Sequence, residues 1–317
     1  MLTYKDWTRY IVKRLLLMIP ILLGISFIIF SIMEFTPGDP VIRKLGTEAD
    51  PSAYVMLREK WNLNAGFLER YFIYIKNIVT KFDFGSSWRT DRPVWAEIGP
   101  RVPVSLRIAS AGIVVSVLFG IPLGIFSAVK QNTVGDNVMR VLSTVLVAVP
   151  GFWLGMLLIL LFALRLGILP VSDDGTFRSY IMPVLVVGLP NGCRILRITR
   201  STMLESIRED YVRTARSKGV PNRIVTYRHA LQNALLPVIT TVGTTFGLAL
   251  GGATIAESVF SMNGMGSLIV MSVRAKDTPT VMSCVLVMAT FFSIVMLLVD
   301  ILMAVIDPRV KAKIKKG

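Results

Sequence analysis

Long runs of uncharged, mostly apolar residues dominate the chain and predict membrane-spanning helices. Five runs contain no Asp, Glu, Lys or Arg and are each at least 19 residues long. About 20 apolar residues in a helix span the hydrocarbon core of a bilayer. We therefore predict spanning helices in residues 15–33, 108–129, 141–164, 230–256 and 278–299. A sixth run, residues 179–193, is only 15 residues long before Arg194 interrupts it.

The placement of charge decides whether the sixth run also crosses. Four segments hold 20 of the 35 Lys and Arg residues but only 6 acids, namely residues 1–14, 130–140, 194–229 and 306–317. The positive-inside rule places such segments in the cytoplasm. Residues 130–140 and 194–229 then lie on the same side of the membrane. The run 141–164 leads away from that side, so the run 179–193 must cross back to it, continuing past its arginines toward Leu204. We predict an all-α integral membrane protein with six crossings and both ends in the cytoplasm.

Composition supports a membrane protein over a soluble one. The chain is 53% hydrophobic and 17% charged, with mean hydropathy +0.62, whereas soluble proteins carry about 25% charged residues. The net charge of +15 falls between apolar segments, which argues against a nucleic-acid face. The first run is too long for a signal peptide and lacks a following Ala-x-Ala site, so we predict a retained helix. Cys193 and Cys284 lie in apolar stretches and indicate neither a disulfide framework nor a metal site.

The segment between the first two spans is long and rich in aromatic residues. Residues 34–98, and the stretch onward to residue 107, carry charges of both signs and many Trp, Tyr and Phe residues. The pattern predicts helices over residues 51–61 and 67–81, followed by a turn at 83–87. A segment of this length is usually functional or disordered, and its aromatic content favours order. We predict an external helical cap that meets a partner, with a simple lid on the bundle as the alternative.

The cytoplasmic loop 194–229 carries the most informative pattern. An acid-rich turn, residues 205–210, precedes the stretch YVRTARSKG, and a second helical stretch begins at residues 221–222. We predict a short helix along the membrane face, in which Ala215 permits close approach by another surface. Gly219 should end it in a left-handed conformation. A basic interfacial helix that only anchors the chain to lipid headgroups is the alternative.

The same loop resembles a known family. Residues 210–237, DYVRTARSKGVPNRIVTYRHALQNALLP, are similar to the coupling loop of ABC-transporter permeases, and most similar to the oligopeptide/dipeptide/nickel import family. Further similar segments follow in order: FDFGSSW (82–88), PVWAEIGPRVPVSL (93–106), VPGFWLG (149–155), GGATIAESVFSMNGMG (251–266) and DPRV (307–310). The resemblance implies a type I importer permease fold, with a first helix in 1–33, a core in 99–306 and a basic tail in 307–317.

The resemblance also implies partners and roles for particular residues. Such a permease pairs with a second, similar permease, binds two cytoplasmic ATPases and receives substrate from an external binding protein. The ATPase-coupling residues would be Asp210, Tyr211, Arg213, Thr214, Ala215 and Gly219. The general pattern is Glu-Ala-Ala, three residues, then Gly, so Arg213 and Thr214 depart from it while Ala215 and Gly219 keep their places. Peptides would be the cargo; nickel, glutathione or another small solute is the alternative.

Glycine patterns in the spans predict close helix packing. Gly243, Gly247 and Gly251 recur every four residues, which is typical of a packing stripe. The alternative is a permease interface lining the pathway, together with Thr240, Thr241 and Thr244. Gly120 and Gly124, with Pro122 between them, predict a second packing site or a bend. Pro150–Gly151 should kink the third helix.

Other classes of function lack their signatures in this sequence. The chain has no Gly-x-x-x-x-Gly-Lys-Ser/Thr loop, so ATP and Mg²⁺ would belong to partner ATPases and this chain would be neither an enzyme nor a cofactor binder. A proton-coupled carrier predicts internal repeats and buried acid–base pairs, which we do not find in the sequence. Glu257 should follow the fifth helix in the external connection, where we predict that it helps to form an outer gate. His229 is the sole histidine and cannot form a metal site alone.

Overall fold

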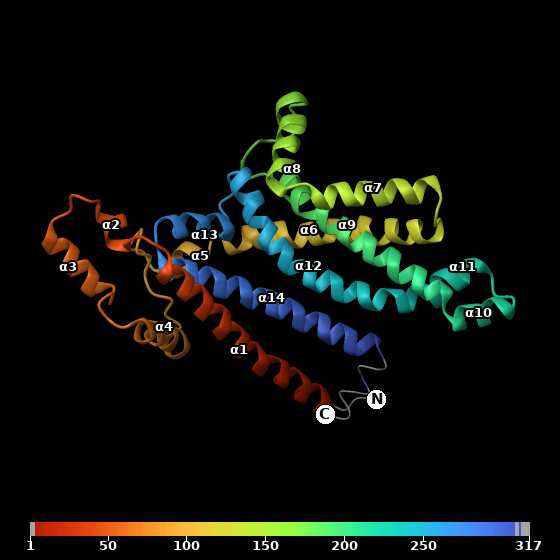
Figure 1. Cartoon of the computed structure of the whole chain (residues 1–317), viewed down its shortest axis with the longest axis horizontal. Helices are drawn as coiled ribbons and strands as arrows, with labels where there is room; N and C mark the ends of the chain where they lie inside the picture. Colours follow the sequence, from red (N-terminus) through yellow and green to blue (C-terminus); the bar gives the residue numbers. More distant parts are fainter. Residues whose placement is uncertain (1–3, 308–310, 312–317) are drawn as a thin grey trace. The chain divides into compact units, whose positions relative to one another are not determined.

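The protein is built from helices, as the sequence predicts. A computed structural model describes residues 4–307 and residue 311 (Figure 1). Apart from Asp307 and Lys311, the predicted basic tail at 307–317 lies outside the described residues. Among them, β pairing is limited to one antiparallel bridge between Ser86 and Pro93. The helices are α1 (Tyr4–Phe35), α2 (Pro40–Leu45), α3 (Pro51–Lys60), α4 (Phe67–Lys81), α5 (Val94–Ile98), α6 (Val102–Val129), α7 (Val134–Ala148), α8 (Gly151–Leu158), the π-helix η1 (Ile159–Arg165), α9 (Arg178–Arg208), α10 (Asp210–Ser217), α11 (Asn222–Ile224), the π-helix η2 (Val225–Ala230), α12 (Leu231–Val259), α13 (Met265–Arg274) and α14 (Thr278–Ile306).

Five of these helical stretches are long and apolar enough to cross a membrane. They are Asp6–Phe35, Val102–Val129, Arg178–Arg208, Asn222–Val259 and Thr278–Ile306. The short sixth run is therefore part of a long helix: α9 has 31 residues and continues past its arginines to Arg208, beyond the predicted Leu204. The count becomes six if α7 and the helix after it form one bent span.

The third predicted span, residues 141–164, is not one straight helix. α7 already begins at Val134, within the predicted loop, and the pair α7 and Gly151–Arg165 is bent by 104°. Proline disfavours helical backbone in the residue before it, and Val149 is extended, with φ −69° and ψ 126°. The kink predicted at Pro150–Gly151 is therefore a complete break, and the prediction of a continuous helix over 141–164 was wrong.

The described contacts divide the chain into two compact units. The first unit contains Met1–Ile11, Ser105–Met262 and Ile294–Gly317, and the second contains Val12–Val104 and Asn263–Ser293.

In the first unit, α6 and α9 are packed backbone against backbone. An added Cβ at Gly120 would lie 2.6 Å from the carbonyl oxygen of Gly192, and one at Gly124 would lie 2.8 Å from that of Leu196. The Ser116 hydroxyl also donates to the Gly188 carbonyl across the two helices, at 2.8 Å. Small residues allow such close approach where lipid supplies no hydrophobic driving force. The predicted packing role of Gly120 and Gly124 is confirmed.

In the second unit, short helices pack around parts of α1 and α14. The predicted helices over 51–61 and 67–81 are confirmed as α3 and α4. Asp50 caps α3 by accepting from the Ser52 amide at 2.9 Å, ahead of Pro51 at the first helical position, an arrangement that favours helix initiation. α5 and α13 share a core formed by Val94, Ile98, Met265 and Leu268 with Cys284 of α14.

Lys276 links the end of α1 to the start of α14 within this second unit. Its buried ammonium donates to the carbonyl of Met33, at 3.2 Å, and to that of Thr36. The last carbonyls of a helix lack partners within the helix, and a lysine can satisfy them. Burial lowers the pKa of Lys276, while the charge of Glu34 opposes that shift. This contact places the last turn of α1 beside the first turn of α14.

The α6–α9 contact leads to a test of stability. Replacing Gly120 by Ala should destabilise the detergent-purified chain by about 1–3 kcal/mol, because overpacking a close contact moves backbone, even though Ala is the better helix former. Both cysteines, Cys193 and Cys284, are buried, so the temperature at which a thiol-reactive dye labels them reports unfolding. Gly24→Ala is the matched control, since no described atom lies within 4 Å of its added Cβ. Equal labelling temperatures for the two variants would contradict the packing role.

Candidate functional site

α10 is a short helix with a well-defined end. Its C-terminus is closed by two backbone hydrogen bonds: the Gly219 amide donates to the Arg216 carbonyl at 2.9 Å, and the Val220 amide donates to the Ala215 carbonyl at 3.2 Å. Gly219 has φ +76°, the left-handed conformation that the sequence predicts. This pattern is the Schellman motif, in which a glycine ends a helix and satisfies its last carbonyls. The motif fixes where α10 stops.

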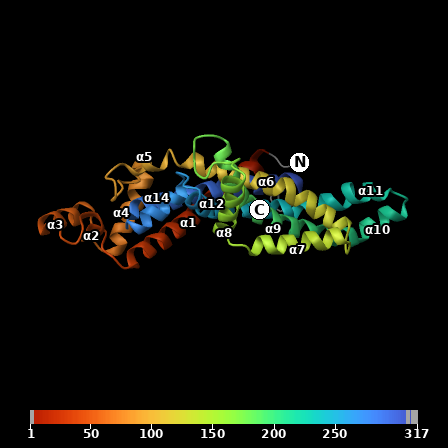
Figure 2. The ribbon, with the colours of Figure 1, turned by 90° about the horizontal axis from the view of Figure 1, so that it is seen from above.

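One side of α10 is buried in a small apolar cluster. Val212, Val225 and Ala230 are fully or almost fully buried and form its centre. Around them pack Ile207, Ala215 and Val220. α10 is thus held against the end of α9 and the start of the following π-helix, and Figures 1 and 2 show it side by side with α11 at one end of α9. Ala215, predicted to contact another surface, lies partly inside this cluster.

The opposite side of α10 is exposed and polar. The side chains of Asp210 and Arg213 are 96% and 76% exposed, with 3.7 Å between Oδ1 and Nη1. Thr214 and Tyr211 are also exposed. The structure therefore brings Asp210, Tyr211, Arg213 and Thr214 to the surface of one rigid helix. We call this surface the α10 face.

An ion pair that sequence reasoning missed connects α7 to α9. Arg200 donates from Nε and Nη2 to the two carboxylate oxygens of Asp136, both at 2.7 Å. Asp136 is fully buried, and it also accepts from the Ser127 hydroxyl and from the Asn132 amide at 3.0 Å. The sequence shows the acid in segment 130–140 and nine basic residues in segment 194–229, but their spacing could not identify which arginine contacts the acid.

The predicted pathway face of α12 divides into two parts. An added Cβ at Gly243 would lie 2.7 Å from Val299 of α14, whereas none of the described atoms lies within 4 Å of one at Gly251. Gly243 is therefore a packing position, and Gly251 faces open space. Thr240 and Thr244 are exposed, while Thr241 and Gly247 are half-buried. Thr240, Thr241 and Thr244 donate to carbonyls of the preceding turn.

Glu257 is predicted to follow the fifth helix, but it lies within α12. α12 continues to Val259, and the Glu257 side chain is fully buried. The hydroxyl of Ser105 in α6 donates to its Oε1 at 2.5 Å. The prediction that Glu257 follows the helix is therefore wrong, because the helical backbone continues two residues beyond it. An outer gate built on Glu257 would have to open this contact.

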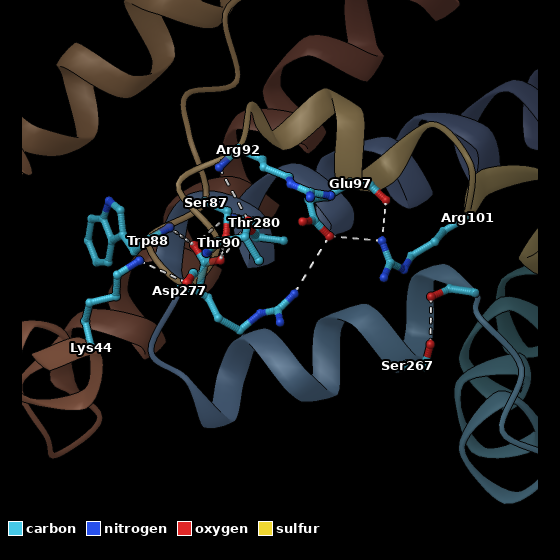
Figure 3. A network of polar contacts seen from close by, with 12 residues as sticks. Lys44, Ser87, Trp88, Thr90, Arg92, Glu97, Arg101, Ser267, Asp277 and Thr280 are labelled. Atoms are coloured by element: carbon cyan, nitrogen blue, oxygen red, sulfur yellow. Dashed lines mark hydrogen bonds and ion pairs between the residues drawn. The ribbon is translucent and has the colours of Figure 1, made fainter. Parts of the chain in front are cut away.

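A third buried acid, Asp277, organises the loops of the second unit (Figure 3). Asp277 precedes α14 and accepts from the Ser87 hydroxyl at 2.5 Å, the Trp88 amide at 3.0 Å and the Thr280 hydroxyl at 2.7 Å. Glu97 lies near it and accepts from Arg101 at 3.0 Å. Sequence reasoning missed Asp277, although an Asp just before a helix that begins with Thr-Pro is a recognisable capping signal.

A cavity of about 360 Å³ lies beside this network in the second unit. Trp61 and Trp88 stack on its wall with ring centroids 4.8 Å apart, and the Glu34–Arg70 ion pair also lines it. At its edge, a hydrogen bond from Lys44 lowers the pKa of Asp91. Three of the charged groups that line the cavity therefore have an ion-pair partner: Glu34, Arg70 and Asp91. Among the described residues, no group of three or more His, Cys, Asp or Glu could hold a metal ion.

Comparisons with known proteins match nearly the whole chain. The family model for the inner membrane component of binding-protein-dependent transport systems matches residues 120–312. A companion model for the N-terminal part of the membrane components of these systems matches residues 7–109.

Individual relatives agree with these family models. The dipeptide transport system permease protein DppB of Alkalihalophilus pseudofirmus is 36% identical over 95% of this chain and 99% of the relative. The glutathione transport system permease protein GsiC is 36% identical in Escherichia coli and 37% identical in Salmonella choleraesuis, over 96% of this chain and 99% of each relative. The chain belongs to the family of inner membrane components of binding-protein-dependent transport systems.

Proposed function

We propose that this chain is the permease subunit of an ATP-binding-cassette importer and forms half of the pathway for peptides across the cytoplasmic membrane. The assignment of a peptide cargo is supported by the match, along nearly the whole chain, to permeases of dipeptide and glutathione systems. Glutathione is itself a short peptide, so both relatives name a cargo of one chemical class. Nickel or another small solute is the alternative cargo of the same machinery.

We propose six crossings, in which α7 and the helix after it make one broken span. This count is supported by the combined length and apolar composition of the bent pair, and by the positive-inside rule, which requires the chain to cross twice between the basic segments 130–140 and 194–229. With the positive-inside rule, both chain ends and α10 then lie in the cytoplasm. Residues 34–98 lie on the external side in this arrangement.

We propose that the α10 face docks on a cytoplasmic ATPase, with a second permease, a second ATPase and an external binding protein completing the transporter. The geometry favours docking over a lipid anchor. An interfacial anchor presents apolar side chains to lipid, whereas Val212 is buried within the chain and the outward residues Asp210 and Arg213 are charged. ATP and Mg²⁺ serve the partner ATPases, and this chain transmits their motion.

The exposed part of the α12 face supports a pathway or permease-interface role. Thr240, Thr244 and Gly251 face outward, and Thr241 and Gly247 lie partly covered beside them. Threonine hydroxyls that donate within the helix keep acceptor lone pairs available. A lining of this kind offers peptide amides weak, uncharged contacts. Conduction needs such weak contacts, because cargo must also leave.

The proposed topology can be tested with Gln131→Cys and Ser172→Cys. Gln131 is exposed between α6 and α7, and Ser172 is exposed between the π-helix η1 and α9. In intact cells a membrane-impermeant maleimide should label Ser172→Cys, and it should label Gln131→Cys only after permeabilisation. The unsubstituted chain is the blank because both native cysteines are buried. Labelling of Gln131→Cys from outside would refute the orientation.

The proposed cargo can be tested with the complete transporter and its binding protein in proteoliposomes. A labelled dipeptide should accumulate only with ATP, and mass spectrometry of the purified binding protein should find a ligand that contains peptide bonds. Unlabelled glutathione in excess shows whether that tripeptide shares the pathway. A bound nickel complex or a ligand without a peptide backbone would overturn the peptide assignment.

The coupling role can be tested with Thr214→Trp. The bulky ring on the α10 face should lower cargo-stimulated ATPase activity and uptake together by about tenfold, equivalent to ~1.4 kcal/mol, while leaving the unfolding temperature of the chain unchanged. Ala215→Asp is less informative, because it would bury a carboxylate in the apolar cluster. Gln131→Trp, at an exposed site on the same predicted side, is the matched control. Normal uptake in the Thr214 variant would refute docking through this face.

A further inference from the structure

α4 lies along α1 rather than above its end. The Tyr71 hydroxyl of α4 donates to the Leu23 carbonyl at 3.0 Å and lies 2.9 Å from the Ser26 hydroxyl. The Phe27 ring lies 5.2 Å from the Tyr71 ring and 5.9 Å from the Phe67 ring, both edge-on. The two helices are therefore in contact over several turns of α1.

α4 also contacts α14 well inside that helix. The Tyr74 and Ser283 hydroxyls lie 2.9 Å apart, and Met282 shares a buried cluster with Phe30 and Tyr71. Lys276 joins the last turn of α1 to the first turn of α14. The depths of the α4 contacts along the two helices can therefore be measured from the same end. α4 occupies the groove between the two helices.

The register of these contacts indicates the depth of α4. Leu23 precedes Glu34, the first charged residue after the apolar run, by 11 positions, which is about 16 Å along a helix. The hydrocarbon core is about 30 Å thick, so the Tyr71 side chain extends into the leaflet that surrounds the second half of α1. Ser283 lies five positions into α14, or roughly 8 Å. A cap in water would contact only the helix ends.

The side of α4 that faces away from the chain is also apolar. Leu68, Phe72 and Val79 are 55%, 64% and 69% exposed and recur at helical spacing. Phe82, just beyond the helix end, is 84% exposed. Glu69, Lys76 and Thr80, about a quarter-turn further round, are exposed and polar. We call Leu68, Phe72, Val79 and Phe82 the α4 stripe.

The α4 stripe lies beside other surface that suits lipid. On the part of α1 that α4 follows, Ile28, Ile32 and Phe35 are more than half exposed, as expected for a spanning helix in contact with acyl chains. A helix with one apolar arc and one charged arc lies in the membrane interface with its apolar arc buried. Large exposed apolar patches on soluble surfaces are rare.

We propose that α4 is an interfacial membrane helix, immersed in the leaflet that surrounds the second half of α1, with the α4 stripe on lipid acyl chains. The polar arc with Lys76 then faces the headgroups and water. This places residues 67–82 of the predicted external cap in the membrane interface and leaves α2 and α3 as the part of that segment in water. The proposal depends on membrane insertion alone and not on the identity of the cargo.

Spin labels on α4, in the complete transporter reconstituted into lipid nanodiscs, test this directly. Nitroxides at Phe72→Cys and Val79→Cys should relax more with oxygen, which partitions into lipid, and less with a soluble nickel chelate. Lys76→Cys and Thr80→Cys, on the polar arc of the same helix, should show the opposite ratio. The chain without an introduced cysteine gives the labelling background, and unchanged thermal unfolding confirms that each variant is folded.

Two outcomes would overturn the proposal. Nickel accessibility at Phe72 and Val79 equal to that at Lys76 would place the stripe in water. Protection from both reagents, lost when the second permease or the binding protein is removed, would place it against a protein partner. Two stripe positions are used so that one perturbed site cannot decide the result.

Discussion

The close contact between α6 and α9 is the constraint on which the first unit depends. Gly120 and Gly124 bring α6 onto the carbonyls of Gly192 and Leu196, and the ring of Phe119 occupies the space that a side chain at Gly192 would need. In lipid, helices gain no hydrophobic energy from each other, so such packing and interhelical hydrogen bonds decide how they associate. These contacts fix the middle of α9, from Gly188 to Thr199, and α10 follows its C-terminal end.

Buried acids near helix ends also connect helices to other segments of the chain. Asp136 receives a two-point contact from Arg200, and removing one member of a buried pair costs about 3–5 kcal/mol because a charge stays unpaired. Glu257 joins α12 to α6 through Ser105. Asp277 joins a loop to the start of α14. α9 is thus fixed to α6 by glycines and to α7 by charge, so α10, which follows α9, is attached to a packed group of helices.

The sequence predicts most of the helices because apolar length and charge placement are properties of short stretches. Charge placement predicts that the short run 179–193 belongs to a helix long enough to cross, and the structure has a 31-residue helix there, although the uncharged run is only 15 residues long. The break at Val149–Pro150 is predicted in position but not in size, because the bend depends on what packs on both sides. The Asp136–Arg200 pair and the burial of Glu257 depend on contacts between distant segments, which no local pattern encodes.

Two short helices show how the outward face of an element identifies its surroundings. α10 buries its apolar residue Val212 within the chain and presents charges, so its outward face suits a polar protein surface. α4 also buries an apolar side, with Tyr71, yet it presents Phe72 and Val79 outward. Both segments are loops between spans in the sequence, and periodicity alone predicts an amphipathic helix for each. The two helices can be told apart only when the structure shows which of their apolar residues are buried within the chain. Apolar residues that stay exposed, as on α4, favour contact with lipid, whereas exposed charges, as on α10, favour a polar partner.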